Sequence, residues 1–159
     1  MKFEELDKRH VHEVEENILK KWKEEDILNE TIKLRDNSNS WVFYDGPIYA
    51  NAKPGIHHVF AKTIKDSFCK YKTMKGYKVL RKIGLDTHGL PIEVNVEKKL
   101  GFKSKADIEA LGVEKFCEAC KVETDSNIDE VKKITDMMGQ FIDCDHPYVT
   151  CDKEYIESE

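Results

Sequence analysis

Two adjacent histidines, His57 and His58, are well suited to chemistry at neutral pH, because imidazole titrates at about pH 6.5. They follow a Pro54–Gly55 turn and open a segment whose apolar residues repeat with the helical period. A helix N-terminus offers free N–H groups and the positive end of a dipole, so histidines at this place can contact a phosphate. The alternative is that one histidine is solvated and the other packs under the loop.

A second group of reactive residue types lies in the turn GLDTHGLP. Asp86 supplies an acid and His88 another imidazole, and both stand between Gly84 and Gly89. The alternative for Asp86 is an ordinary turn or N-cap role, which is a common use of aspartate before threonine and glycine.

The elements that must position these two groups alternate between strand and helix. A strand is expected over WVFYDG, a helix over IHHVFAKTIKDSFCKYKTMKG, a strand over YKVLRKIG and a helix over PIEVNVEKKLG. This order predicts an α/β fold with a parallel sheet. Ligands bind beyond the carboxyl ends of such strands, so we expect the two loops to face one pocket.

Further elements flank this unit. A charged helix with one apolar stripe is expected from about Asp7 to Leu28, so residues 1–37 are interpreted as a helical arm with its linker, before a domain over 38–159. Two more helices are expected after Ser104 and after Ser126, with these serines as caps. The last segment, HPYVTCDKEYIESE, is expected to be an extended tail.

Composition excludes several classes of function. The 159 residues are 40% hydrophobic with a formal net charge of -5, which argues against disorder and against coating of a nucleic acid, and we expect no DNA partner. No stretch approaches the roughly 18 apolar residues of a membrane span, and no apolar signal core is visible. The cytoplasm is therefore the expected compartment, with no membrane partner.

The five cysteines are odd in number and are expected to be reduced. Cys117, Cys120, Cys144 and Cys151 could be drawn as a four-thiolate zinc site, but EKFCEACKVE has a helical pattern and lacks the glycine-rich turn of such pairs. Core packing is the favoured interpretation, and no protein-bound metal is predicted.

Several motifs in order resemble the catalytic N-terminal half of the class I aminoacyl-tRNA synthetases, most closely the isoleucyl members. FYDGPIYANAKPGIHH resembles the loop that ends in the histidine-isoleucine-glycine-histidine signature, and KDSFCKYKTMKGYKVLRKIG resembles the helix and strand that follow. GLDTHGLPIEVNVEKKLG resembles the amino-acid-binding turn. PYVTCDKEYIES resembles the segment just ahead of the editing insertion, so the likeness reaches the C-terminus.

This resemblance implies the first half of a Rossmann-like nucleotide-binding sheet and an isoleucine-tRNA ligase activity. Isoleucine would be activated by ATP, with Mg2+ in the substrate complex, and transferred to tRNA(Ile). Asp86 would pair with the substrate ammonium group. The implied catalytic residues are His57 and His58; the implied ATP site is Tyr49, Asn51, Gly55, His57 and His58; the implied amino-acid site is Gly46, Pro47, Asp86 and His88.

Two positions depart from the family pattern. Gly55 stands where the signature has its first histidine, and His57 stands where it has glycine. Leu85 stands where the amino-acid-binding turn usually has tryptophan, which loosens the pocket wall or only repacks it.

The resemblance covers only the start of the family architecture. The sequence contains no KMSKS-like run, no editing insertion, no second half of the sheet and no anticodon-binding domain, so we expect little or no adenylation by these residues alone. Alternatives are a stand-alone synthetase-like paralogue that binds a nucleotide or a partner, a valyl- or leucyl-tRNA synthetase fragment, and a different nucleotidyl transferase.

Overall fold

The computed structural model describes residues 9–49 and 53–158. The elements follow in the order α1 (Val11–Glu24), α2 (Ile27–Lys33), β1 (Ser40–Tyr44), β2 (Ile48–Tyr49), α3 (Ile56–Met74), β3 (Lys78–Asp86), α4 (Leu90–Leu100), α5 (Lys105–Leu111), α6 (Val113–Met137), β4 (Asp143–Val149) and α7 (Lys153–Ser158). In the part of the chain that is described, no helix is both long and apolar enough to cross a membrane.

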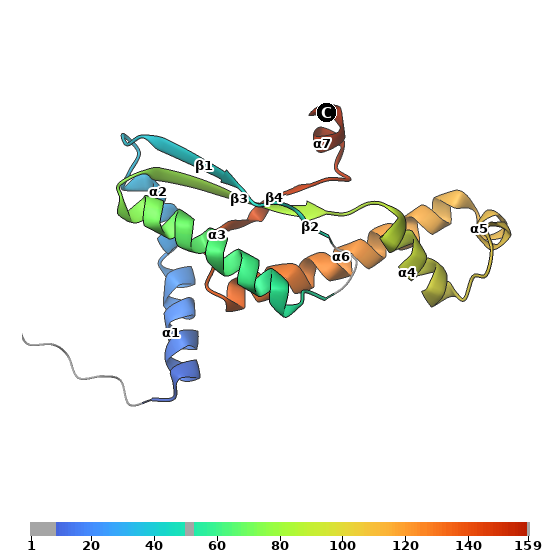
Figure 1. Ribbon diagram of the computed structural model, residues 1–159, viewed down its shortest axis with the longest axis horizontal. Helices are drawn as coiled ribbons and strands as arrows, with labels where there is room; N and C mark the ends of the chain where they lie inside the picture. Colours follow the sequence, from blue (N-terminus) through green and yellow to red (C-terminus); the bar gives the residue numbers. More distant parts are fainter. Residues whose placement is uncertain (1–8, 50–52, 159) are drawn as a thin grey trace, which may run out of the picture.

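The central strand of the sheet is β3, which has neighbours along both edges (Figure 1). Lys82 of β3 pairs with Tyr44 of β1 on one edge and with Asp143 of β4 on the other. Leu85 is likewise flanked by β2 and β4, so β1 and β2 share one edge of β3. Every pairing is parallel, and all strands therefore end at the same edge of the sheet, as the predicted α/β fold requires.

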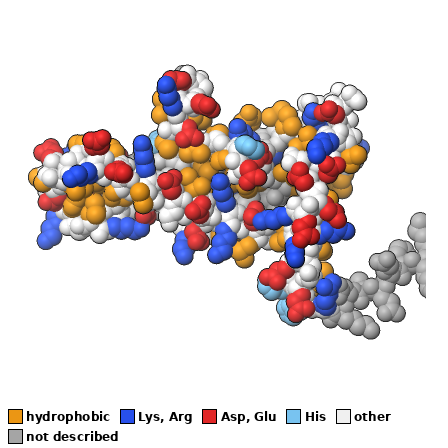
Figure 2. All heavy atoms as spheres, turned by 180° about the vertical axis from the view of Figure 1, so that it is seen from behind, with side chains coloured by type: hydrophobic (Ala, Val, Ile, Leu, Met, Phe, Trp, Pro, Cys, Tyr) orange, Lys and Arg blue, Asp and Glu red, His pale blue; other side chains and the backbone are white. Residues whose placement is uncertain are grey.

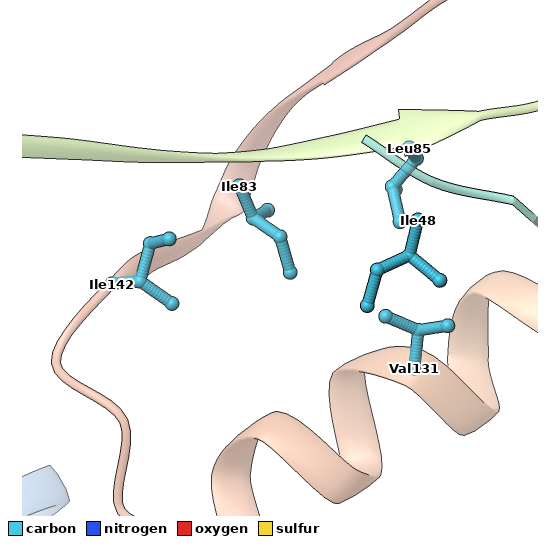
Figure 3. Close-up of a cluster of buried hydrophobic side chains, with 5 residues drawn as sticks. All are labelled: Ile48, Ile83, Leu85, Val131 and Ile142. Atoms are coloured by element: carbon cyan, nitrogen blue, oxygen red, sulfur yellow. The ribbon is translucent and has the colours of Figure 1, made fainter. Parts of the chain in front are cut away.

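The hydrophobic core lies between the sheet and α6. It contains Ile48, Ile83, Leu85, Val131 and Ile142, whose side chains converge from β2, β3, α6 and the connection into β4 (Figure 3). The alternation of buried residues along β3 directs this side of the strand toward the helices.

Helix α3 covers the same side of the sheet as α6 (Figure 1), but the face it buries is largely polar. Its buried residues are Lys62, Asp66 and Cys69. The apolar positions that predict the helix are exposed: Ile56, Phe60, Ile64, Phe68 and Tyr71. The buried charges are paired, since Lys62 Nζ lies 3.0 Å from Asp45 and Asp66 lies 2.5 Å from Lys70 Nζ.

Some predicted element boundaries are wrong. The N-terminal helix is interrupted at Asp26, whose φ of 48° lies in the left-handed region, and the chain continues as α2. Ser104 is the N-cap of α5 as predicted, but Ser126 lies inside α6. The break between these helices falls at Gly112, whose φ of 97° favours glycine.

The loop and tail predictions also need correction. The segment expected as a loop after β1 contains β2, and the expected extended tail is partly helical because it ends in α7. The beginning of the expected first helix, at Asp7, lies outside the described residues. The division of the chain after residue 37 stays a prediction.

The Tyr148 side chain of β4 packs against β3 at Gly84. A Cβ at this position would lie 2.2 Å from the ring of Tyr148 and 2.6 Å from the backbone oxygen of Asp45. The Tyr148 hydroxyl donates a hydrogen bond to that same oxygen, so neither neighbour can move without loss of the contact.

We therefore expect Gly84→Ala to lower the free energy of unfolding by about 1 to 3 kcal/mol, the range for an overfilled site. Urea denaturation measures this change. Gly46→Ala is the matched control, because its Cβ would meet only Lys65 Nζ at 3.8 Å. Equal stability of the two variants would contradict the close packing of Tyr148 on Gly84.

Candidate functional site

Strand β1 leads directly into a buried carboxylate. Asp45 is fully buried, and it accepts hydrogen bonds from Lys62 Nζ at 3.0 Å and from Lys65 Nζ at 2.6 Å. Its N–H donates to the backbone oxygen of Lys82 at 2.9 Å, and its own backbone oxygen accepts from the Tyr148 hydroxyl. These contacts fix the chain at the point where the first loop leaves the sheet.

His58 caps the N-terminus of α3. The Gly55 N–H donates to His58 Nδ1 at 3.0 Å, and the His58 N–H donates back to the Gly55 oxygen at 3.0 Å. Because an accepting Nδ1 carries no proton, the proton of the neutral ring is on Nε2, which can donate to a ligand. Burial, and then the charges of His57 and Lys62, lower the pKa of His58 and favour this neutral form.

His57 is exposed and lies against His58, with 3.9 Å between ring centroids. A Cβ added to Gly55 would lie 2.8 Å from His57 Cε1. The imidazole of His57 therefore occupies the space in which a side chain at position 55 would begin.

Strand β2 brings Tyr49 beside Asp86, its partner in the parallel register with β3. Burial, and then the charge of Asp86, raise the pKa of Tyr49, so its hydroxyl stays protonated. Gly89 has a φ of 107°, and a Cβ there would lie 3.1 Å from the Tyr49 hydroxyl. Glycine lets the turn enter α4 close to this tyrosine.

Thr150, the residue after β4, reaches the same turn. Its hydroxyl oxygen lies 2.9 Å from His88 Nδ1 and 3.4 Å from Asp86 Oδ1. Sequence reasoning missed Thr150, and also missed the buried pair of Asp45 and Lys62. A threonine in an extended segment carries no motif, whereas the Asp-Gly that ends β1 was a signal that could have directed attention to Asp45.

The structure brings together Tyr49, Asp86 and His88 at the end of β3. His57 and His58 form a separate pair at the start of α3, and Asn51 lies outside the described residues. Gly46 and Pro47 are exposed just beyond β1. The expectation that both loops share one pocket stays a prediction.

Leu85 is fully buried in the core cluster, where it packs with Ile48 and Val131. Leu85 stands where the family's turn usually has tryptophan, and its burial favours a repacked core over a loosened pocket wall.

A hollow of about 670 Å³ adjoins the His88 side of the site, between α4, α5 and α6. Its lining includes Ile92, Phe116, Cys117 and Cys120, and Figure 2 shows hydrophobic side chains among charged ones at this end of the molecule. All five cysteines are free. Across residues 9–49 and 53–158, no group of three or more His, Cys, Asp or Glu side chains is arranged to hold a metal ion.

The site thus offers two kinds of contact at the carboxyl edge of a parallel sheet. A helix N-terminus with a neutral imidazole follows the first strand, and a carboxylate ends the central strand. Such a combination is typical of the first half of a Rossmann-like sheet.

The family model of the class I tRNA synthetases (I, L, M and V) matches residues 17–159, and the chain belongs to this family. The predicted family is confirmed.

Curated relatives carry the name isoleucine-tRNA ligase. The protein of Bacteroides thetaiotaomicron is 46% identical over 158 residues, which are 99% of this chain and 14% of that protein. The protein of Clostridium kluyveri is 46% identical over 147 residues, 92% of this chain and again 14% of the relative. The chain thus spans about one seventh of the length of these relatives.

Among solved structures, the LeuRS of Agrobacterium radiobacter K84, in a ternary complex with tRNA and LeuAMS, matches with a TM-score of 0.63. The match covers 93% of this chain and 17% of that one, at 20% sequence identity. The predicted half of a Rossmann-like synthetase fold is therefore confirmed.

We expect His58 to titrate below pH 6.5 in the folded chain. As the pH falls, the unfolded state binds this proton first, so the contribution of His58 to stability is complete above pH 6.5 and is lost below it. NMR titration of the ring and urea unfolding at about pH 7.5 and about pH 5.5 measure both effects.

The control is His58→Asn, which keeps an acceptor near the Gly55 N–H and does not titrate. This variant should lose less stability between the two pH values than the native chain. Titration of His58 at or above pH 6.5 would show that the ring is not held in its neutral form.

Proposed function

We propose that this chain provides the ATP- and isoleucine-binding half of an isoleucine-tRNA ligase. The observation that carries the proposal is the pairing of β2 with β3, which sets Tyr49, from the loop that leads to the histidines, beside Asp86 at the carboxyl edge of the sheet. The choice of isoleucine is supported by the names of relatives that are 44 to 46% identical to the chain.

ATP binds at the loop between β1 and α3 in this proposal. His58 Nε2–H and the α3 N-terminus donate to the phosphate oxygens, and their contribution grows as negative charge develops there in the transition state. Gly55, Tyr49 and Asn51 complete the nucleotide contacts, and Mg2+ enters with ATP as part of the substrate.

The amino acid binds at the turn after β3. The Asp86 carboxylate accepts the ammonium group of isoleucine, with Gly46, Pro47 and His88 around it. The carboxylate of isoleucine then attacks the α-phosphorus of ATP, and pyrophosphate leaves to give isoleucyl-adenylate. A ribose hydroxyl of tRNA(Ile) next takes the isoleucyl group, and AMP is released.

The reaction needs groups that these 159 residues do not contain. Other parts of the enzyme, which correspond to the remaining length of the relatives, supply a further cation for the phosphates. They also complete the pocket around the isoleucine side chain. In this proposal the enzyme acts in the cytoplasm, where aminoacylated tRNA is used in translation.

The proposal is tested in a chimaera in which residues 1–159 replace the matching 14% of the Bacteroides thetaiotaomicron ligase. We expect isoleucine-dependent exchange of pyrophosphate into ATP. His58→Ala should lower kcat roughly 100-fold with little change in the KM for isoleucine, because its donor acts mainly in the transition state. Asp86→Asn should raise that KM roughly 30-fold, since a charge partner is lost.

His12→Ala is the control, because His12 is exposed on α1, away from the sheet edge. An inactive chimaera that folds would contradict the proposed function, and so would an exchange reaction that depends on valine or leucine instead. If His58→Ala and Asp86→Asn change kcat and KM alike, the division of roles is wrong.

His57 takes the place of the signature's first histidine in this proposal. His57→Gly should slow exchange in the chimaera roughly 100-fold. A second change, Gly55→His, should restore much of the rate, because a side chain at position 55 begins where the His57 ring lies. The backbone there, with φ -93° and ψ 173°, accepts any residue.

Gly55→His alone is the control for this pair, since two imidazoles would then compete for one space. A double variant no faster than His57→Gly would show that the position of the ring above Gly55 has no catalytic use.

A further inference from the structure

Thr150 joins the end of β4 to the turn that carries Asp86. Its N–H donates to the backbone oxygen of Leu85 at 3.1 Å, which extends the pairing of β4 with β3 by one residue. Thr150 is only 5% exposed, although His88 of the turn it touches is exposed. A hydroxyl buried in such a place needs partners.

The partners of this hydroxyl come from three successive residues. It accepts from the Thr87 N–H at 3.0 Å, and its oxygen lies 2.9 Å from His88 Nδ1 and 3.4 Å from Asp86 Oδ1. The Thr87 hydroxyl in turn accepts a hydrogen bond from the N–H of Cys151, the residue after Thr150, at 3.1 Å. The two threonines therefore lock the β4 exit and the turn together.

The number of hydrogens limits the directions that these bonds can take. A hydroxyl has one hydrogen and two acceptor positions, and an ionised carboxylate can only accept. One arrangement satisfies Asp86, His88 and the Thr87 N–H together: His88 Nδ1–H and the Thr87 N–H donate to the Thr150 oxygen, and the Thr150 hydrogen points to Asp86. The Thr87 hydroxyl, 3.4 Å from the Thr150 oxygen, is then a weaker fourth contact. His88 is then the Nδ1–H tautomer, with the lone pair of Nε2 directed away from Thr150.

We propose that Thr150 is a positioning residue, whose hydroxyl bridges the Asp86 carboxylate and the His88 imidazole and fixes both for recognition of the amino-acid ammonium group. The inference rests on the proposed function for its consequence in binding, but the bridge itself is a property of the chain. Thr150 does not touch the substrate. It restricts Asp86 and His88 before the substrate binds, so that less conformational entropy is lost on binding.

The test uses Thr150→Val, which keeps the shape and removes the hydroxyl, and Thr150→Ser, which restores it. In the 159-residue chain, 15N NMR of the imidazole nitrogens should report the Nδ1–H tautomer of His88 in the native and Ser forms and a different tautomer balance in the Val form. Identical His88 signals in the native and Val forms would overturn the bridge, and so would an Nε2–H tautomer in the native chain.

The second measurement uses the chimaera with the Bacteroides thetaiotaomicron ligase. Thr150→Val should raise the KM for isoleucine about 10-fold, the effect of one lost hydrogen bond, with kcat nearly unchanged, and Thr150→Ser should restore it. Thr135→Val is the matched control, because Thr135 is equally buried and its hydroxyl donates only within α6, to Val131.

A KM that does not rise in Thr150→Val, or a Ser variant that behaves like the Val variant, would overturn the positioning role. A native chimaera without isoleucine-dependent exchange would instead refute the proposed function, and the NMR measurement on the chain then decides the bridge by itself.

Discussion

The fold depends on the burial of the Asp45 carboxylate at the end of β1. A buried carboxylate costs several kcal/mol unless it is paired and hydrogen-bonded, and here two lysines of α3 supply the pairing. Lys62 is 2% exposed and also donates to Gln140, between α6 and β4, at 3.2 Å. Lys62 therefore joins three parts of the chain: the end of β1, the first turns of α3 and the connection into β4. The histidine loop begins at the first of these parts and ends at the second.

The pairing of Lys62 with Asp45 explains the orientation of α3. Once Lys62 must reach Asp45, the face of the helix with Asp66 and Cys69 also turns inward, where Arg81 of β3 donates to the Cys69 oxygen at 3.3 Å. Burial raises the pKa of the Cys69 thiol to about 11, so it stays protonated in this polar layer. The apolar stripe of the helix is left on the outside. Parallel sheets are normally covered on both faces, and an exposed apolar helix face is consistent with a chain that spans only one seventh of its relatives.

Local signals in the sequence predicted what is local in the structure. Gly101 ends α4 in the left-handed conformation, Pro91 opens it, and the alternation of strand and helix gave the parallel sheet. The face of α3 could not be predicted from periodicity, because a buried ion pair outweighs the apolar stripe. Thr150 could not be predicted either, since it meets Asp86 across 64 residues and only the register of β4 brings them together. The two histidines and Asp86 were singled out by their residue type and their place in the turns, and the family motifs mark them as well; their roles stay predictions.

The electrostatics of the sheet edge separate the two candidate sites. The histidine loop leads into a helix N-terminus, whose free N–H groups and dipole favour an anion. Burial, and then the charges of His57 and Lys62, lower the pKa of His58 and favour its neutral form. The turn after β3 has the opposite sign, because the Asp86 carboxylate stands there beside the Thr150 hydroxyl, which also contacts the His88 imidazole. A ligand with a phosphate at one end and an ammonium group at the other matches both signs at once. In the proposed function, an α-amino acid joined to a nucleotide phosphate has this arrangement of charge, whereas a nucleotide alone would leave the carboxylate without a cationic partner.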